Sequence, residues 1–283
     1  MKFKSIVIIF NITLLLFLGI LILLPSLILG SSYAGAFWQM GWYVVLILGL
    51  IFCAFNIIYF LNRKLLMLLE KEDWPALIHY LEEKVIQKGK YSSRFVRLLA
   101  NTYLVLSDSA SVTSLENRVA AIKPVLLDEN VLIFGIARIF GKDFLGASRF
   151  FETRKGTVKP AQKDWVCWYY GFSLLLNHQY KEAGEEFSLL AGMSNDAVVS
   201  GLSSYFLSET LAPLSGDNEP ELRQTAVLGR ERVLKIIRGV NKWKHEVSRL
   251  STEIHAVAIS KYMEDTGRWL FSINQEQIAN DES

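Results

Sequence analysis

The beginning of the chain differs from the rest in its pattern of hydrophobic and polar positions. Residues 6–29 are almost wholly apolar, and a second apolar stretch covers residues 42–61. Each stretch is long enough for a helix that crosses a bilayer, which takes about 20 residues. The segment between them is uncharged and rich in aromatic residues, which favour the surface layer of a membrane. The pattern predicts a transmembrane helical hairpin over residues 1–64, with an aromatic loop between the two spans.

Beyond residue 64, apolar residues recur at the spacing of amphipathic helices, and short polar segments separate one helix from the next. No stretch alternates convincingly in the way that a half-buried strand does. The pattern predicts an all-α domain over residues 65–240, a long final helix over 241–273 and a frayed tail over 274–283. Five residues form an apolar stripe along the final helix and need a surface to pack against: Trp243, Val247, Leu250, Ile254 and Val257.

Small and aromatic residues of the all-α domain recur after a fixed interval of 36 positions. Because small and aromatic residues pack in different ways, one interval shared by both kinds is not expected by chance. The first set and its equivalents are Gly135, Phe144, Ala147 and Phe151, followed by Gly171, Tyr180, Ala183 and Phe187. A fainter echo, Trp74, lies 70 positions before Phe144. A fixed period of about 20 to 50 residues predicts a solenoid of stacked helix pairs, and such solenoids commonly bind other proteins.

The later of these two units resembles the tetratricopeptide repeat. The likeness rests on a first helix with an aromatic run that ends at Gly171, a turn over residues 177–180, and a second helix with Ala183 and Phe187. The interval of 36 positions departs slightly from that family's period of about 34 residues. A membrane hairpin followed by such repeats is also similar in layout to bacterial membrane-anchored tetratricopeptide proteins of the HemY type. The resemblance implies an α-solenoid that binds proteins.

The resemblance also implies a concave groove lined by the first helix of each unit. In the later unit the lining positions are Trp165, Trp168, Phe172, Leu175 and Leu176, and in the earlier unit they are Glu129, Leu132, Ile136, Ile139 and Phe140. Nearly all are apolar, unlike the basic and amide residues with which the carboxylate-clamp subfamily holds a peptide terminus. The groove therefore predicts an apolar or amphipathic protein segment as partner. The apolar stripe of the final helix also needs burial, so the sequence favours a groove that this helix fills or caps over one that is open to a partner.

Charge argues against nucleic acid as a partner and predicts an orientation. The chain has 30 basic and 28 acidic residues, and four of the cations flank the acid-free hairpin: Lys2, Lys4, Arg63 and Lys64. The rest of the chain is therefore close to neutral overall. Cytoplasmic flanks of membrane spans are enriched in Lys and Arg, so we expect the N-terminus and the repeat domain on the cytoplasmic side of a bacterial-type inner membrane. A periplasmic repeat domain and a cleaved signal peptide are the alternatives.

Polar and small residues inside the apolar stretches predict how the hairpin packs. Asn11 and Asn56 are uncharged amides, and we expect them to bond across the hairpin rather than to form a transport path. Gly49 and Cys53 lie four positions apart and offer a small-residue face for close helix packing. Cys53 and Cys167 are expected to be buried thiols rather than a disulfide framework.

No combination of residues in the sequence predicts catalysis, a cofactor or a metal. The four histidines are scattered, and the sequence contains no phosphate-binding loop and no metal-ligand spacing. We therefore expect a non-enzymatic, membrane-anchored scaffold whose partners are the lipid bilayer and other proteins. The alternatives are a structural subunit of an envelope machine, such as a secretion system or a flagellar motor, and an accessory subunit of a membrane enzyme. The oligomeric state does not follow from the sequence.

Overall fold

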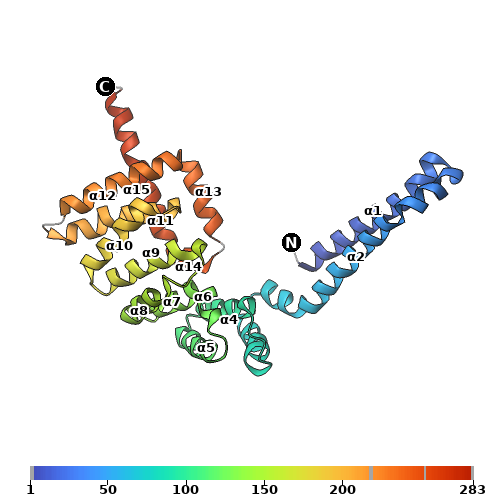
Figure 1. The fold of residues 1–283 in the computed structure, drawn as a ribbon, viewed down its shortest axis with the longest axis horizontal. Coiled ribbons are helices and arrows are strands. Elements are labelled where there is room, and N and C mark those ends of the chain that lie inside the picture. The colour runs from blue at the N-terminus through green and yellow to red at the C-terminus, as the bar shows by residue number, and fades with distance from the viewer. Residues whose placement is uncertain (1–2, 217–218, 252, 282–283) are drawn as a thin grey trace. The chain divides into compact units, whose positions relative to one another are not determined.

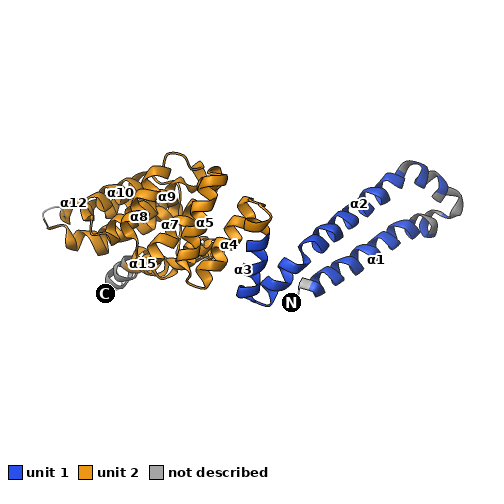
Figure 2. Ribbon diagram, turned by 90° about the horizontal axis from the view of Figure 1, so that it is seen from below, with its two compact units in different colours: residues 1–83 blue, residues 84–283 orange. Residues whose placement is uncertain are grey.

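The described chain consists of helices joined by short turns (Figure 1). The computed structural model describes residues 3–216, 219–251 and 253–281, and these residues contain no strand. The all-α fold predicted from the sequence is therefore confirmed. The chain divides into two compact units, Met1–Glu83 and Lys84–Ser283, which we call the hairpin unit and the repeat unit (Figure 2).

The hairpin unit consists of α1 (Phe3–Leu29), α2 (Ser31–Glu70) and α3 (Trp74–Glu82), with α1 and α3 each packed against α2. Only Gly30 separates α1 from α2, and its φ of 77° is one that glycine adopts easily. The predicted aromatic loop is wrong, because residues 31–41 are helical and belong to α2. These residues include neither proline nor charge that would interrupt a helix. At its other end α2 continues without a break beyond the predicted boundary at residue 64.

Two helical segments in this unit, Lys4–Leu24 and Gly41–Glu70, are long and apolar enough to cross a membrane. The core helix of a soluble protein passes the same test, but such a helix is buried by the rest of its chain. Here the most apolar window of each segment has none of its residues buried. The apolar side chains therefore lie on the surface of the hairpin unit, and in water they would be uncovered.

A reciprocal pair of amide hydrogen bonds joins α1 to α2. The Nδ2 atom of Asn11 donates to Oδ1 of Asn56 at 3.0 Å, and Nδ2 of Asn56 donates back to Oδ1 of Asn11 at 3.0 Å. The bond predicted between these two amides is thus confirmed. The predicted small-residue face is wrong, because a Cβ added to Gly49 would meet no atom within 4 Å and Cys53 is exposed. The amide pair, rather than small residues, marks the contact between the helices.

The repeat unit contains the remaining helices. Their bounds are α4 (Ser93–Val105), α5 (Ser109–Ile122), α6 (Val125–Glu129), α7 (Val131–Phe140), α8 (Phe144–Arg154), α9 (Pro160–Leu176), α10 (Tyr180–Met193), α11 (Ala197–Phe206), α12 (Glu219–Ile236), α13 (Val240–Leu250), α14 (Ile254–Ala258) and α15 (Ser260–Asp281). Short π-helical turns cover Glu83–Gln87 and Leu207–Leu211, and a 3₁₀ turn covers Ala212–Leu214.

One backbone turn recurs four times, at intervals of 35, 35 and 36 residues. It joins α2 to α3, α4 to α5, α7 to α8, and α9 to α10. Each copy has a non-glycine residue in the left-handed region, and these are Glu72 (φ 52°), Ser107 (58°), Lys142 (59°) and His178 (61°). The N–H of the following residue bonds to the carbonyl five positions earlier, at 2.9 to 3.2 Å. This is the Schellman arrangement that ends a helix. The period seen first in the glycines therefore extends back to residue 72.

An aspartate follows the left-handed residue in three of the four turns and caps the next helix. Asp73 accepts from the N–H of Ala76, Asp108 from Ser111 and Asp143 from Gly146, at 3.2, 3.0 and 2.9 Å. A side chain at this position satisfies one of the unpaired N–H groups of the helix that begins there. The interval of 35 positions between the three aspartates is visible in the sequence, although the left-handed residues before them share no chemistry.

In each helix pair, the recurring glycine of the first helix packs against the recurring phenylalanine of the second. A Cβ added to Gly135 of α7 would overlap the ring of Phe151 in α8, and one added to Gly171 of α9 would lie 3.1 Å from the ring of Phe187 in α10. Both phenylalanines are fully buried, as are the echoed alanines Ala147 and Ala183, while Phe144 and Tyr180 begin the second helices and are half-buried. Glycine thus allows the two helices of each pair to approach closely.

The helix pairs stack into two layers (Figures 1 and 2). From α7 to α12 each helix packs against the next one in the chain. In addition α7 contacts α9 and α9 contacts α11, while α10 contacts α12. The helices α7, α9 and α11 therefore form one layer of the repeat unit, and α8, α10 and α12 form the other. The layer of α7, α9 and α11 carries the predicted groove residues.

The single final helix predicted over 241–273 is wrong, because the structure has three helices there. One break lies between Leu250 and Ile254, and the next lies at Ile259. The breaks allow α13 to return alongside α15, with the indole N–H of Trp243 donating to the carbonyl of Met263 at 3.2 Å. The helix also continues through residues 274–281, where a frayed tail was predicted. Residues 282–283 lie outside the described chain.

Substituting the two echoed glycines should give graded losses of stability. We expect Gly135→Ala to lower the free energy of unfolding by about 1–3 kcal/mol, since the new methyl group would overlap a buried ring. Gly171→Ala should lower the free energy of unfolding by less, because the added Cβ would lie 3.1 Å from the nearest ring atom of Phe187. The control is Gly156→Ala, whose Cβ would meet no atom within 4 Å. Urea unfolding of the detergent-solubilised chain, followed by circular dichroism, measures all three, and equal effects for Gly135→Ala and Gly156→Ala would contradict the packing described.

Substituting the left-handed lysine by glycine should stabilise the repeat unit. An L-residue in this region costs about 1–2 kcal/mol, and part of that gain is offset because glycine is more flexible when unfolded. We expect Lys142→Gly to raise the melting temperature by about 2 °C. Lys142→Ala removes the same charge but keeps the strained φ, so it should not stabilise. A thermal melt in which both variants shift equally would point to charge rather than to backbone conformation.

Candidate partner groove

The residues predicted to line a groove lie on α7 and α9, apart from Glu129 at the end of α6, but most of them are already covered. Six are buried: Trp165, Trp168, Phe172 and Leu175 of α9, and Leu132 and Ile136 of α7. Leu176, Ile139 and Glu129 are half-buried, and Phe140 is 49% exposed. The structure therefore brings the predicted residues into one layer, yet leaves only the end near Phe140 open.

The aromatic residues of α9 recur at helical spacing and form a continuous stripe. The ring centroids of Trp168 and Phe172 are 5.1 Å apart and stacked, and those of Trp168 and Tyr169 are 5.1 Å apart and edge-on. Trp168 also contacts Phe187 of α10 and Phe206 of α11, with centroids 6.1 and 5.7 Å away. Trp168 is therefore a core residue between helix pairs, and its assignment to an open groove is wrong.

The C-terminal segment of the chain lies on the other side of this stripe. We call residues 240–272 the C-terminal strap. The hydroxyl of Tyr169 donates to the backbone carbonyl of His255 at 2.7 Å, and the His255 ring lies 4.9 Å from that of Trp165. Further along, the ring of Tyr262 lies 5.9 Å from Phe172. Of the two possibilities that the sequence left open, the structure shows the filled groove.

Two further contacts hold the strap against α11 and α12. The ring of Trp243 lies against Gly201 and Gly267, and a Cβ at these positions would come within 3.0 and 2.6 Å of it. The guanidinium of Arg230 on α12 donates through Nε and Nη2 to the carbonyl of Leu270, at 3.0 and 2.5 Å. The strap is thus fixed at both ends, while the part nearest His255 rests on the aromatic stripe.

Burial controls the charge of the histidine on the strap. His255 is 6% exposed, and desolvation lowers the pKa of its imidazole to about 4, so the ring is neutral at pH 7. Its Nδ1 atom is buried and finds no hydrogen-bond partner in the described chain. A pocket of about 300 Å³ adjoins it, with Arg97, Glu129, Asp196 and Arg249 among the charged residues in its wall. Protonation at this place would put an unpaired positive charge in the groove.

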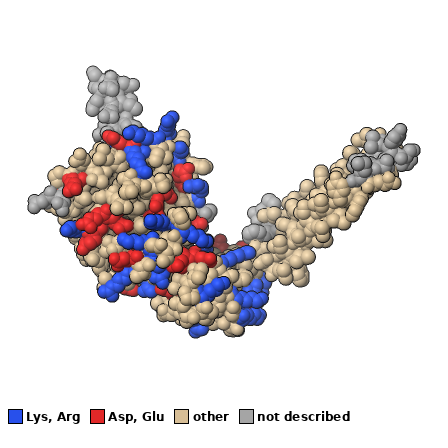
Figure 3. Space-filling model, in the orientation of Figure 1, with Lys and Arg blue, Asp and Glu red and all other residues tan. Residues whose placement is uncertain are grey.

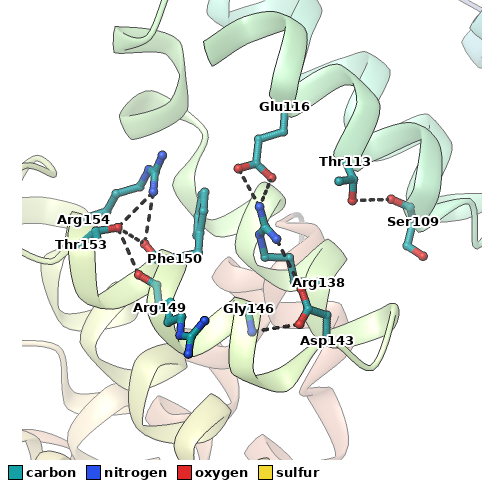
Figure 4. Close-up of polar contacts among 10 residues, drawn as sticks. All are labelled: Ser109, Thr113, Glu116, Arg138, Asp143, Gly146, Arg149, Phe150, Thr153 and Arg154. Carbon is teal, nitrogen blue, oxygen red and sulfur yellow. Dashed lines mark hydrogen bonds and ion pairs between the residues drawn. The ribbon is translucent and has the colours of Figure 1, made fainter. Parts of the chain in front are cut away.

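A polar network that sequence reasoning missed joins α5, α7 and α8 (Figure 4). Nη2 of Arg138 donates to both carboxylate oxygens of Glu116, at 3.0 and 2.9 Å, and Nη1 donates to Asp143 at 3.4 Å. The ring of Phe150 lies under the guanidinium groups of both Arg138 and Arg154, at 5.3 and 4.0 Å. These charges neutralise one another and join three helices, so we interpret them as structural.

The described residues contain no group of three or more His, Cys, Asp and Glu that could hold a metal ion. Burial and the neighbouring Glu186 raise the pKa of the Cys167 thiol to about 11, so this thiol stays protonated at neutral pH. Cys167 is buried as predicted, whereas Cys53 is exposed.

Acidification should weaken the strap through His255. The pKa of His255 is lower in the folded chain than the ordinary value of about 6.5, so the unfolded chain binds a proton first and stability falls as the pH drops from 6.5 towards 4. Between pH 7 and 5 we expect His255 to account for a loss of about 2 kcal/mol. Unfolding in guanidinium at both pH values measures this loss of stability. His255→Phe should lose this part of the pH dependence, whereas replacement of the exposed His245 by Gln should keep it.

Comparisons with known proteins place the chain in a family. No solved structure matches it. A protein of Treponema pallidum (strain Nichols), described as an uncharacterized protein, is 27% identical over 288 residues, covering 96% of this chain and 88% of that protein. A family model described as "Uncharacterised Treponema protein" matches residues 111–272, which run from α5 to the end of the C-terminal strap. As this match covers more than half of the sequence, the chain belongs to the family of that description.

Proposed function

We propose that this chain is a membrane-anchored scaffold that recruits other proteins through the aromatic face of its repeat unit. The observation that carries the proposal is the strap itself. The layer of α7, α9 and α11 already holds a helical segment through aromatic contacts and one hydrogen bond from the Tyr169 hydroxyl to the backbone of that segment. A surface that binds such a segment in cis has the chemistry to bind a similar segment of another protein.

The membrane anchor is supported by what the hairpin exposes. Large apolar side chains project from both helices, with Leu27 of α1 80% and Phe60 of α2 73% exposed. The two amides that would be costly in lipid are instead bonded to each other. The proposal therefore places α1 and α2 across a bacterial-type inner membrane. The flanking Lys and Arg favour a cytoplasmic repeat unit.

The likeness to tetratricopeptide repeats supports the choice of protein partners. It rests on the close approach of glycine and phenylalanine in two helix pairs and on the four equivalent turns. The two-layer stacking of α7 to α12 agrees with it. Solenoids of this kind present their inner layer to partners, and tethering to a membrane raises the local concentration of the binding surface.

The partner's chemistry follows from the contacts that it would replace. Burial holds the pKa of the Tyr169 phenol well above its usual range, so the hydroxyl stays protonated and donates a hydrogen bond. A partner that replaces the strap must therefore offer an acceptor to this hydroxyl. Trp165 and Phe172 need an apolar or aromatic side chain in place of His255 and Tyr262. We therefore propose an amphipathic helical segment, which binds when the strap leaves the groove.

A photocrosslinker in the groove tests this proposal. Benzoylphenylalanine at position 172 should react with the strap when the groove is filled and with a partner when it is open. Arg230→Gln removes the charged hydrogen bonds that hold the strap at Leu270, outside the groove, and that the partner does not replace. The loss is worth about 1.5 kcal/mol, so this variant should raise the yield of partner adducts in native membranes about tenfold. Arg223→Gln on the same helix is the control, because that guanidinium pairs with Glu219 rather than with the strap. Capture that does not respond to Arg230→Gln would contradict binding in the groove.

A further inference from the structure

A segment at the beginning of the repeat unit is strongly basic, although the chain as a whole is close to neutral. No Asp or Glu occurs between Glu83 and Asp108, and this interval contains five cations: Lys84, Lys88, Lys90, Arg94 and Arg97. We call residues 84–97 the basic segment. It follows soon after the second apolar stretch of the chain, since Gly41–Glu70 ends 14 positions before Lys84.

The fold gathers these cations on one surface. The N–H of Lys90 bonds to the carbonyl of Lys84 at 3.1 Å, which closes a loop between the π-helical turn and α4. The ammonium of Lys84 lies over the ring of Phe95, 5.1 Å from its centroid, so the turn and the first residues of α4 are neighbours. Lys88, Lys90, Arg94 and Arg97 are exposed. Figure 3 shows blue side chains gathered at the α4 end of the repeat unit.

Aromatic side chains accompany the charge. Tyr91 and Phe95 lie within the basic segment and are half-buried, so each is partly accessible. Aromatic rings favour the headgroup layer of a membrane, and Lys and Arg next to them favour anionic headgroups. Arg97 also has a structural contact, because it donates to the side chain of Asn130 and to the carbonyl of Glu129.

We propose that the basic segment binds the phosphate groups of anionic lipids and so forms a second membrane contact, outside the hairpin. This inference rests on the proposed membrane anchor. Since α3 occupies most of the chain between Glu70 and Lys84, this connection spans at most about 35 Å, and the anchor keeps the segment near the bilayer surface. A lipid surface is favoured over nucleic acid because the tether presents lipid continuously. On the face of the repeat unit seen in Figure 3, the surface away from α4 carries both signs of charge.

The test uses the full chain in nanodiscs. A fluorophore is attached to Gln87→Cys in a Cys53→Ala background, since the native Cys167 is buried and protonated. The discs contain either zwitterionic lipid alone or about 30% phosphatidylglycerol, with a nitroxide quencher on the headgroups. We expect quenching to rise with the anionic lipid and to fall again in about 0.5 M salt, because salt screens exposed charges.

Charge removal identifies the residues responsible. Each cation near an anionic surface strengthens binding about fivefold, so Lys88→Gln, Lys90→Gln and Arg94→Gln together should abolish the response to anionic lipid. The matched control removes three exposed cations elsewhere, by Lys235→Gln, Arg238→Gln and Lys244→Gln, and should keep the response.

The possible failures are distinguishable. A chain that does not enter zwitterionic discs would refute the membrane anchor itself. A chain that enters them but shows equal quenching with and without anionic lipid would overturn the lipid contact alone, as would an equal loss in the control variant. Binding of an oligonucleotide through the same three cations, without a response to lipid, would assign the surface to nucleic acid instead.

Discussion

The close approach of helices at Gly135 and Gly171 is the constraint on which the repeat unit depends. Without a Cβ at these positions, the rings of Phe151 and Phe187 sit directly on the backbone of the neighbouring helix. This contact sets the distance between the two helices of a pair, and through α8 and α10 it sets where the next pair begins. The aromatic stripe of α9 then has its position determined from both sides. Interiors packed at this density transmit a misplaced side chain to their neighbours, so the glycines matter well beyond their own pairs.

The strap and the aromatic stripe are best understood as one packed core. The stripe contacts α10 and α11 on one side and the strap on the other. Its position depends on distant partners, with Trp243 filling the space left by two glycines and Arg230 bonding a carbonyl of α15. The family match extends over both the helix pairs and the strap, in agreement with a single structural unit. A partner that enters the groove must therefore replace a native contact rather than fill an empty space.

The parts of the fold that could be predicted from the sequence are those with a local or periodic signal. The apolar stretches, the amide pair and the echoed glycines belong to this class. The break in the final helix does not, because it depends on where Trp243 packs rather than on the residues at the break. The contact between Arg138 and Glu116 joins positions 22 apart and follows no spacing rule. The groove residues were placed on the correct helices, but sequence patterns do not reveal that another part of the chain covers them. The recurring turn could not be predicted from the sequence, because the residue in the left-handed region differs in each copy.

The unbroken course of α2 has a mechanical consequence. The helix runs from the apolar stretch to Glu70 without a break, and there it meets the first of the four turns. An α-helix advances about 100° for every residue, so inserting or deleting one residue near Asn62 would rotate everything after it by that angle. Leu65 and Leu68, which are buried in the present arrangement, would then point away from their contacts. The length of α2 therefore sets a rotational phase between the apolar stretch and the first turn, and changes in multiples of seven residues would nearly preserve it.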